Sequence, residues 1–239
     1  MTFRSFAAGA ACAVLLAACG GDAADAPKLP NAASAEPVRT LSGVPVTQFD
    51  HEASVQRLYL AYFGRAADPG GLAYYTELSW RFGLAADTGA LYWRHGVDAD
   101  VRAILDGMAT SPEADAFYGP DSRTTLTLMY RNLFNREPDE GGLAYWADLL
   151  ERGVLTRGQV PLALLAGADI ADLTIFDRKA AVATAFTAAL DTPERAARYN
   201  GAAAVDALRA VLAKIDANTS PAHERALVEE ALAAIGAAG

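Results

Sequence analysis

Histidine and cysteine, the residue types that most often bind metals or act as nucleophiles, are scarce in this chain. The three histidines are His51, His95 and His223, and no two of them stand at the short spacing that zinc ligands require. His95 is the one beside another residue of interest, Trp93, and we expect its ring to be solvated. The histidines therefore predict no zinc site.

Carboxylates are the second group that could carry chemistry, and calcium is the metal they would suit. Asp68 and Asp139 each stand in a glycine-containing loop, and Glu140 follows the second aspartate. Calcium takes six to eight oxygen ligands, so these few carboxylates would form a weak site at best. An N-cap role explains both aspartates without a metal. We therefore predict no metal and no cofactor.

A glutamate could instead act as the general acid of a peptidoglycan-cleaving hydrolase. Glu77 and Glu113 are the eligible residues near aromatic side chains. However, Glu113 fits the first turn of a helix that starts at Pro112, and Glu77 is expected on the exposed side of its helix. The sequence also has no Glu-Ser-Gly signature, serine elbow or phosphate-binding glycine loop. We assign no catalytic residue and keep the hydrolase as the alternative function.

An internal repeat reveals the elements that would position these residues. Residues 55–78 match residues 126–149 at a constant offset of 71, with ten identities in 24 positions. A repeated block of this kind indicates one supersecondary unit used twice. The identical pairs are Tyr59/Tyr130, Phe63/Phe134, Arg65/Arg136, Asp68/Asp139, Gly70/Gly141, Gly71/Gly142, Leu72/Leu143, Ala73/Ala144, Tyr74/Tyr145 and Leu78/Leu149.

Each copy has the pattern of two amphipathic helices joined by a tight corner. Apolar residues before the corner recur at i, i+3, i+4, i+7 and i+8, which places them on one helical face. Gly64 and Asn135 suit a left-handed residue that ends the first helix. Asp68 and Asp139 suit the N-cap of the second, where a carboxylate accepts hydrogen bonds from free N–H groups. The predicted helical hairpins span residues 55–82 and 126–152.

The remaining corner residues also have structural interpretations. Arg65 and Arg136 can reach free carbonyls of the preceding helix or the neighbouring aspartate. Pro69 suits the first helical position, which needs no N–H donor. Close packing is expected where the second helix begins. The predicted structural motif consists of Gly64, Arg65, Asp68, Gly71, Arg136, Asp139 and Gly142.

The two corners resemble a known bacterial family, domain of unknown function 4214, which occurs in secreted, surface-layer and RTX-type proteins. The resemblance rests on Gly64-Arg65-x-x-Asp68-x-x-Gly71-Leu72-x-Tyr74-Tyr75 and on Arg136-x-Pro138-Asp139-x-x-Gly142-Leu143-x-Tyr145-Trp146. The second copy is the closer match, although it has Asn135 where a glycine is usual. The similarity extends over about residues 50–200. It implies a helical domain of surface proteins and no particular reaction.

The amino terminus resembles the signal of a bacterial lipoprotein. Residues 1–18 combine one basic residue, Arg4, with an apolar run that is too short to span a membrane. Leu16-Ala17-Ala18-Cys19 resembles a lipobox, which implies cleavage before Cys19 and its lipidation. Ordinary cleavage, with an incidental Cys19, is the alternative. Residues 19–48 contain four prolines and few residues able to form a core, so we predict a disordered tether.

The charge balance is acidic, with 20 basic and 29 acidic residues and a net charge of −9. Removal of Arg4 with the signal would give 19 − 29 = −10 for the mature chain. This charge argues against nucleic-acid binding and against electrostatic docking on anionic lipid. Loss of Cys12 with the signal would leave no disulfide, so the domain must be stabilised by its core.

Helix signals continue to the end of the chain, and we predict one all-α globular domain over residues 49–239. It is a helical bundle with helices expected at about residues 176–190, 202–216 and 221–235, and with a capping box at Thr156-x-x-Gln159. Segment 83–97 has the least clear pattern and could be a loop. Most aromatic residues at helical spacing are expected in the core. Those kept as a possible binding surface are Trp93, Tyr75 and Trp146.

These features together favour a non-enzymatic lipoprotein of the bacterial cell envelope. Its lipid would hold it to the membrane, facing the periplasm or the cell surface. Its helical domain would bind or scaffold an envelope protein or glycan.

Overall fold

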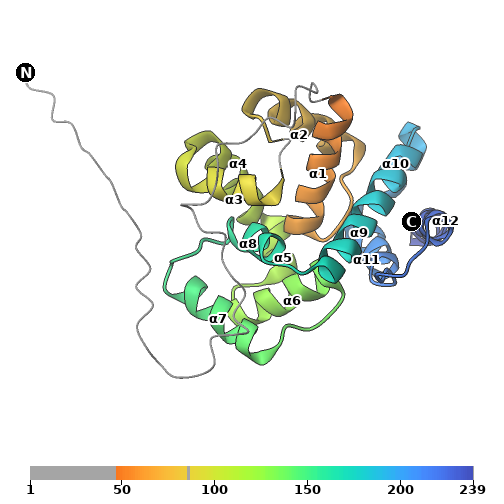
Figure 1. Ribbon diagram of the computed structural model, residues 1–239. Coiled ribbons are helices and arrows are strands. Elements are labelled where there is room, and N and C mark those ends of the chain that lie inside the picture. The colour runs from red at the N-terminus through yellow and green to blue at the C-terminus, as the bar shows by residue number, and fades with distance from the viewer. Residues whose placement is uncertain (1–46, 85–86, 239) are drawn as a thin grey trace, which may run out of the picture.

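The computed structural model describes residues 47–84 and 87–238, which form helices with no strand among them (Figure 1). The all-α prediction is therefore confirmed. The signal segment, Cys19 and the tether up to residue 46 lie outside the described residues. The helices are α1 (Gln48–Phe63), α2 (Pro69–Phe82), α3 (Thr88–Val97), α4 (Ala99–Ala109), α5 (Pro112–Tyr118), α6 (Ser122–Phe134), α7 (Glu140–Glu151), α8 (Val160–Ala166), α9 (Ile170–Ala189), α10 (Pro193–Arg198), α11 (Gly201–Leu212) and α12 (Pro221–Ala238).

The two predicted hairpins are α1–α2 and α6–α7, and their first helices pack against each other. Helix α1 is the central element of the core, because every residue from Leu58 to Phe63 is buried. It contacts α2, α5, α6, α8 and α9. Burial of such a continuous run is the largest source of stabilisation available to a domain that has no disulfide.

The C-terminal helices form a separate layer on one side of the hairpins (Figure 1). Helix α9 connects this layer to the rest, since it packs against α1, α6 and α12. Helix α11 in turn packs on α12. On another side, α3 and α4 follow the first hairpin, and α3 packs on α8.

Segment 83–97 differs from the expectation of a loop, because most of it is helix α3. Asp87 caps this helix by accepting a hydrogen bond from the Ala90 N–H at 2.8 Å. Gly89 and Gly96 lower the intrinsic helix propensity of the segment, which explains its weak signal. Packing of Leu91 and its neighbours in the core overrides that propensity.

Three other local expectations need correction. Helix α9 begins at Ile170, earlier than expected, because Asp169 caps it by accepting from the Asp172 N–H at 2.8 Å. Helix α11 ends at Leu212, before the expected residue 216. The capping box at Thr156 is half formed. The Gln159 side chain accepts from the Thr156 N–H at 3.0 Å, but no side chain caps α8.

Candidate functional site

The two hairpin corners have the backbone geometry that their sequences predict. Gly64 and Asn135 end α1 and α6 in the left-handed conformation, with φ of 63° and 54°. Asp68 accepts from the Gly71 N–H at 2.8 Å, and Asp139 accepts from the Gly142 N–H at 2.7 Å. Each aspartate thus has the predicted N-cap role, which links the turn of the chain to the start of the next helix.

The corner arginines lie in equivalent surroundings in the two copies. The Arg65 guanidinium lies 5.1 Å from the ring centroid of Tyr59, and Arg136 lies at the same distance from the ring of Tyr130. Each arginine also donates to the backbone of its own corner, Arg65 to the Ala66 carbonyl and Arg136 to the Glu137 carbonyl. The repeat therefore fixes the position of the guanidinium as well as the path of the chain.

Each arginine also binds a carboxylate that the sequence did not reveal. Arg65 binds both oxygens of Glu113, the second residue of α5, with Nη2–Oε2 at 2.9 Å. Arg65 Nη1 also lies 3.4 Å from Asp68 Oδ2. Arg136 binds both oxygens of Asp172, in the first turn of α9. The acidic partner comes from a later helix in both cases, and no residue spacing near the corners indicates it.

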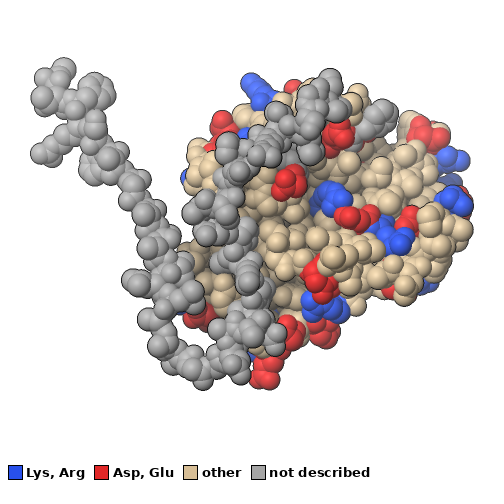
Figure 2. All heavy atoms as spheres, in the orientation of Figure 1, with Lys and Arg blue, Asp and Glu red and all other residues tan. Residues whose placement is uncertain are grey.

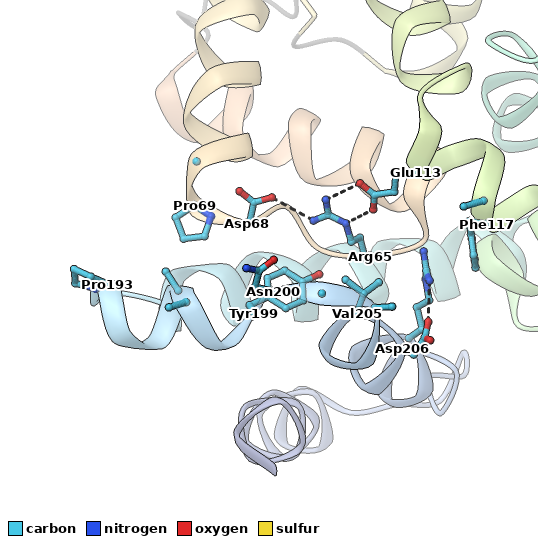
Figure 3. Close-up of a pocket in the computed structure, with 17 residues that line it drawn as sticks. Arg65, Asp68, Pro69, Glu113, Phe117, Pro193, Tyr199, Asn200, Val205 and Asp206 are labelled. Atoms are coloured by element: carbon cyan, nitrogen blue, oxygen red, sulfur yellow. Dashed lines mark hydrogen bonds and ion pairs between the residues drawn. The ribbon is translucent and has the colours of Figure 1, made fainter. Parts of the chain in front are cut away.

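The first corner forms one wall of a groove with a volume of about 970 Å³ (Figure 3). The opposite wall is formed by α10 and α11, and the Arg65–Glu113 ion pair lies between the two walls. The first corner is predicted from the sequence but the groove is not, because α10 and α11 lie more than 120 residues further along the chain. The residues that line the groove include Pro69, Phe117, Tyr199, Val205 and Arg209.

Charges in the groove are paired within the protein. Burial alone would lower the pKa of Arg65, but its interactions with Glu113 and Tyr199 together more than offset that effect, so the guanidinium stays charged. Arg209 Nη1 pairs with Asp206 at 2.9 Å, and its Nη2 donates to the Phe63 carbonyl at 2.7 Å. Among the described residues that line the groove, each of the two arginines is paired with a carboxylate, so neither is a free cation for an anionic ligand.

The aromatic rings of the groove are not open platforms. The Arg209 guanidinium lies over the Phe117 ring, 3.7 Å from its centroid. Tyr199 is buried, its hydroxyl donates to the Ala66 carbonyl at 2.9 Å, and burial raises its pKa. A sugar ring needs an exposed aromatic face on which to stack, so the groove is poorly suited to glycans. Its small side chains and exposed Asn200 suit a polypeptide.

The aromatic residues expected at a binding surface do not form one. Trp146 is 1% exposed, and its Nε1 donates to the Tyr130 hydroxyl at 3.2 Å, so its interpretation as a surface residue is wrong. Tyr75 is half-buried and packs edge-on against the Tyr59 ring. Trp93 is exposed, but it lies on α3 and not at either corner. The Trp146 indole, expected at a binding surface, instead packs inside the second hairpin.

Two of the three histidines are buried, which corrects the expectation of a solvated His95. His95 is 2% exposed, and its Nε2 lies 2.7 Å from Asp106 Oδ1. His51 Nδ1 lies 2.7 Å from the Ser79 hydroxyl, and burial lowers the pKa of this ring. His223 is exposed. Among the described residues, no three His, Cys, Asp or Glu side chains are grouped in a way that could hold a metal ion.

The two glutamates considered as general acids have different positions. Glu77 is exposed on α2 and does not line the groove. Glu113 lines the groove, but Arg65 engages both of its oxygens. Neither oxygen is therefore free to protonate a leaving group in this arrangement.

Comparison with known protein families gives one match, to the family described as "Domain of unknown function (DUF4214)", over residues 106–173. The chain resembles this family over that range, which contains the second hairpin and its Arg136–Asp172 ion pair. The second copy was the closer match by sequence, and it is the copy inside the range. The match is shorter than the expected residues 50–200. No curated protein and no solved structure matches the chain.

Proposed function

We propose that this protein is a lipid-anchored protein of the bacterial cell envelope whose helical domain binds a polypeptide segment of an envelope partner in the groove between the first corner and α10–α11. The groove is the observation that carries the proposal. Its volume of about 970 Å³ falls within the range of specific binding sites. The internally paired arginines and covered rings favour a largely uncharged polypeptide over an anion or a glycan.

The envelope location rests on the lipobox-like residues that end at Cys19. In the part of the chain that the structure describes, no helix is long and apolar enough to cross a membrane. An N-terminal lipid would supply membrane attachment without a spanning helix.

Replacement of Cys19 by alanine should release the protein from the membrane fraction or leave an uncleaved precursor. Unchanged membrane fractionation would contradict the anchor.

The surface charge supports a protein partner over a nucleic acid. The net charge is −9, and Figure 2 shows basic side chains interspersed with acidic ones on the visible face. Nucleic-acid binding needs a basic patch that neutralises several phosphates. Among the described residues that Figure 2 shows, the basic side chains form no such patch.

Blocking the groove tests the binding site directly. Ala202 lines the groove on α11, whereas Ala203 is exposed on the same helix and does not line it. We expect Ala202→Trp to abolish capture of a partner from envelope extracts, because the indole fills the groove. The matched Ala203→Trp variant should keep the partner. Equal capture by both variants would place binding elsewhere.

A peptidoglycan hydrolase remains the competing function, because Glu113 lies in the groove wall. Zymography on peptidoglycan separates the two functions. The binding function predicts no clearing by the wild type. Clearing that Glu113→Gln removes and Glu77→Gln retains would establish the hydrolase instead.

A further inference from the structure

The C-terminal end of α2 and the helix α3 that is joined to it expose large apolar side chains that neither the core nor the groove uses. Trp80 at the C-terminal end of α2 is 53% exposed. Trp93 and Val97 lie one turn apart on α3 and are 39% and 62% exposed. Arg94, which lies between them in sequence, donates to the Phe82 and Gly83 carbonyls at 2.7 and 2.5 Å and so joins α3 to the end of α2.

This end is also where the chain enters the domain. The His51 ring, in the first turn of α1, stacks on the Trp80 indole with centroids 4.1 Å apart. Helix α1 begins at Gln48 after the N-cap Thr47, and Figure 1 shows its first turns beside α2. Thr47 lies 47 − 19 = 28 positions after Cys19. Even a fully extended chain of that length reaches no more than about 100 Å.

We propose that the end of the domain that carries Trp80, Trp93 and Val97 docks on the interfacial region of the membrane that holds the lipid of Cys19. The proposal rests on the lipid anchor of the proposed function. Tryptophan favours the boundary between headgroups and acyl chains, where its ring is buried and its N–H stays near water. The exposed Arg81, which lies over the Phe82 ring, can keep its charge among the headgroups.

The charges at this end of the domain determine whether it can dock on anionic or on neutral lipid. Acidic residues flank these positions in the chain. Asp50 and Glu52 stand on either side of His51, Asp98 follows Val97, and Asp87 caps the start of α3. They would repel an anionic surface, so apolar insertion and not charge attraction holds the domain there. Docking should therefore occur on neutral phosphatidylcholine and persist at high salt.

Tryptophan fluorescence in lipid vesicles tests the proposal. The mature lipidated protein is reconstituted into phosphatidylcholine vesicles with plain or brominated acyl chains, since bromine quenches only tryptophans within the bilayer. We expect brominated lipid to quench the emission, and replacement of both Trp80 and Trp93 by phenylalanine to remove the quenching. Trp146 is 1% exposed in the core and serves as an internal reference that should not be quenched.

The possible outcomes separate this proposal from the proposed function. A protein that is recovered with the vesicles but shows equal emission in plain and brominated lipid overturns the docking and leaves the anchor intact. Absence of quenching together with self-association that Trp80→Ser and Trp93→Ser abolish would assign this end to a second copy of the chain. A protein that does not stay with the vesicles overturns the anchor and the docking together.

Discussion

The guanidinium of Arg136 binds both carboxylate oxygens of Asp172, with Nε–Oδ1 at 2.9 Å and Nη2–Oδ2 at 2.6 Å. Asp172 is buried in the first turn of α9, so this ion pair connects the second corner to the longest helix of the domain. In the first copy the equivalent arginine, Arg65, connects its corner to α5 through Glu113. The two arginines thus have the same kind of partner, although the offset of 71 does not relate the positions of the two carboxylates.

We expect Arg136→Ala to lower the free energy of unfolding by about 2–3 kcal/mol, because it leaves the buried Asp172 carboxylate without its partner. Arg136 is itself 45% exposed at its side chain, which keeps the loss below that of a fully buried pair. Urea denaturation measures the change. The exposed Arg152–Asp148 pair provides a control, and Arg152→Ala should cost less than about 0.5 kcal/mol. Equal losses in the two variants would contradict a structural role for the Arg136–Asp172 pair.

Adjacent glycines of the first corner should respond differently to alanine. A Cβ on Gly71 would lie 3.0 Å from Cζ of Tyr59 and closer still to its hydroxyl, whereas a Cβ on Gly70 meets nothing nearer than 3.4 Å. We therefore expect Gly71→Ala to destabilise the domain by about 1–3 kcal/mol through overpacking against the buried Tyr59. Gly70→Ala should be neutral or stabilise by up to about 1 kcal/mol through its higher helix propensity. Thermal unfolding measures the stability of both variants. A larger loss in Gly70→Ala than in Gly71→Ala would contradict the close contact between Gly71 and Tyr59.

Sequence predicted the features of this fold that depend on local interactions. Caps, left-handed residues and apolar stripes are set by neighbours within a few positions, and those around Asp68 and Asp139 took their predicted conformations. The match of two copies strengthened each prediction, because the same local chemistry occurs twice. The weakest local signal, at α3, belongs to a helix with two glycines whose stability comes from packing.

The features that sequence did not predict depend on contacts between distant segments. The carboxylate partners Glu113 and Asp172 lie 48 and 36 residues from their arginines. The groove and the burial of His95 and Trp146 likewise depend on how helices pack and not on local pattern. In such cases the residue type limits what a side chain can do, and only the fold decides whether it is exposed.

The N-cap role of the corner aspartates leads to a prediction about calcium. A ligand bound only by the native state stabilises it by about 2.7 kcal/mol at a concentration of 100 Kd, so calcium at a real site would raise the Tm. Asp68 and Asp139 already accept backbone N–H groups, and we expect melting curves in EDTA and in millimolar calcium to overlay. Asp139→Ala should lose about 0.5–2 kcal/mol of N-cap stabilisation equally in both conditions. A rise in Tm with calcium that Asp139→Asn removes would show that the corner binds the ion.

Lys179 in α9 gives the fold an unusual dependence on pH. This lysine is 2% exposed, and its Nζ donates to the Asn132 carbonyl in the last turns of α6. The Asn132 side chain continues the network, with Nδ2 donating to the Leu60 carbonyl and to the Tyr118 hydroxyl, each at 2.7 Å. Burial lowers the pKa of Lys179 from 10.5 to about 7. The amine therefore becomes neutral in the folded protein at a pH where it is still charged in the unfolded chain.

This difference sets the sign of the pH effect. Between pH 7 and 10.5 the unfolded chain binds a proton at Lys179 that the folded protein does not, so the contribution of Lys179 to stability rises by up to about 1.4 kcal/mol per pH unit. Below about pH 7 both states are protonated, and the full cost of burying the charge is present. Lys179→Met removes that cost, although it also leaves the Asn132 carbonyl without its donor.

We expect Lys179→Met to be more stable than the wild type near pH 6 and to lose that advantage as the pH rises, by about 3 kcal/mol in total between pH 7 and about pH 9.5. Urea denaturation at a series of pH values measures the difference between the two proteins, which cancels the titration of all other groups. Lys214 is the matched control, because its side chain is 53% exposed and pairs with Glu230 on the surface. Lys214→Met should show no comparable trend. A difference between Lys179→Met and the wild type that stays constant with pH would mean that Lys179 remains charged in the folded protein, held by the carbonyl at the end of α6.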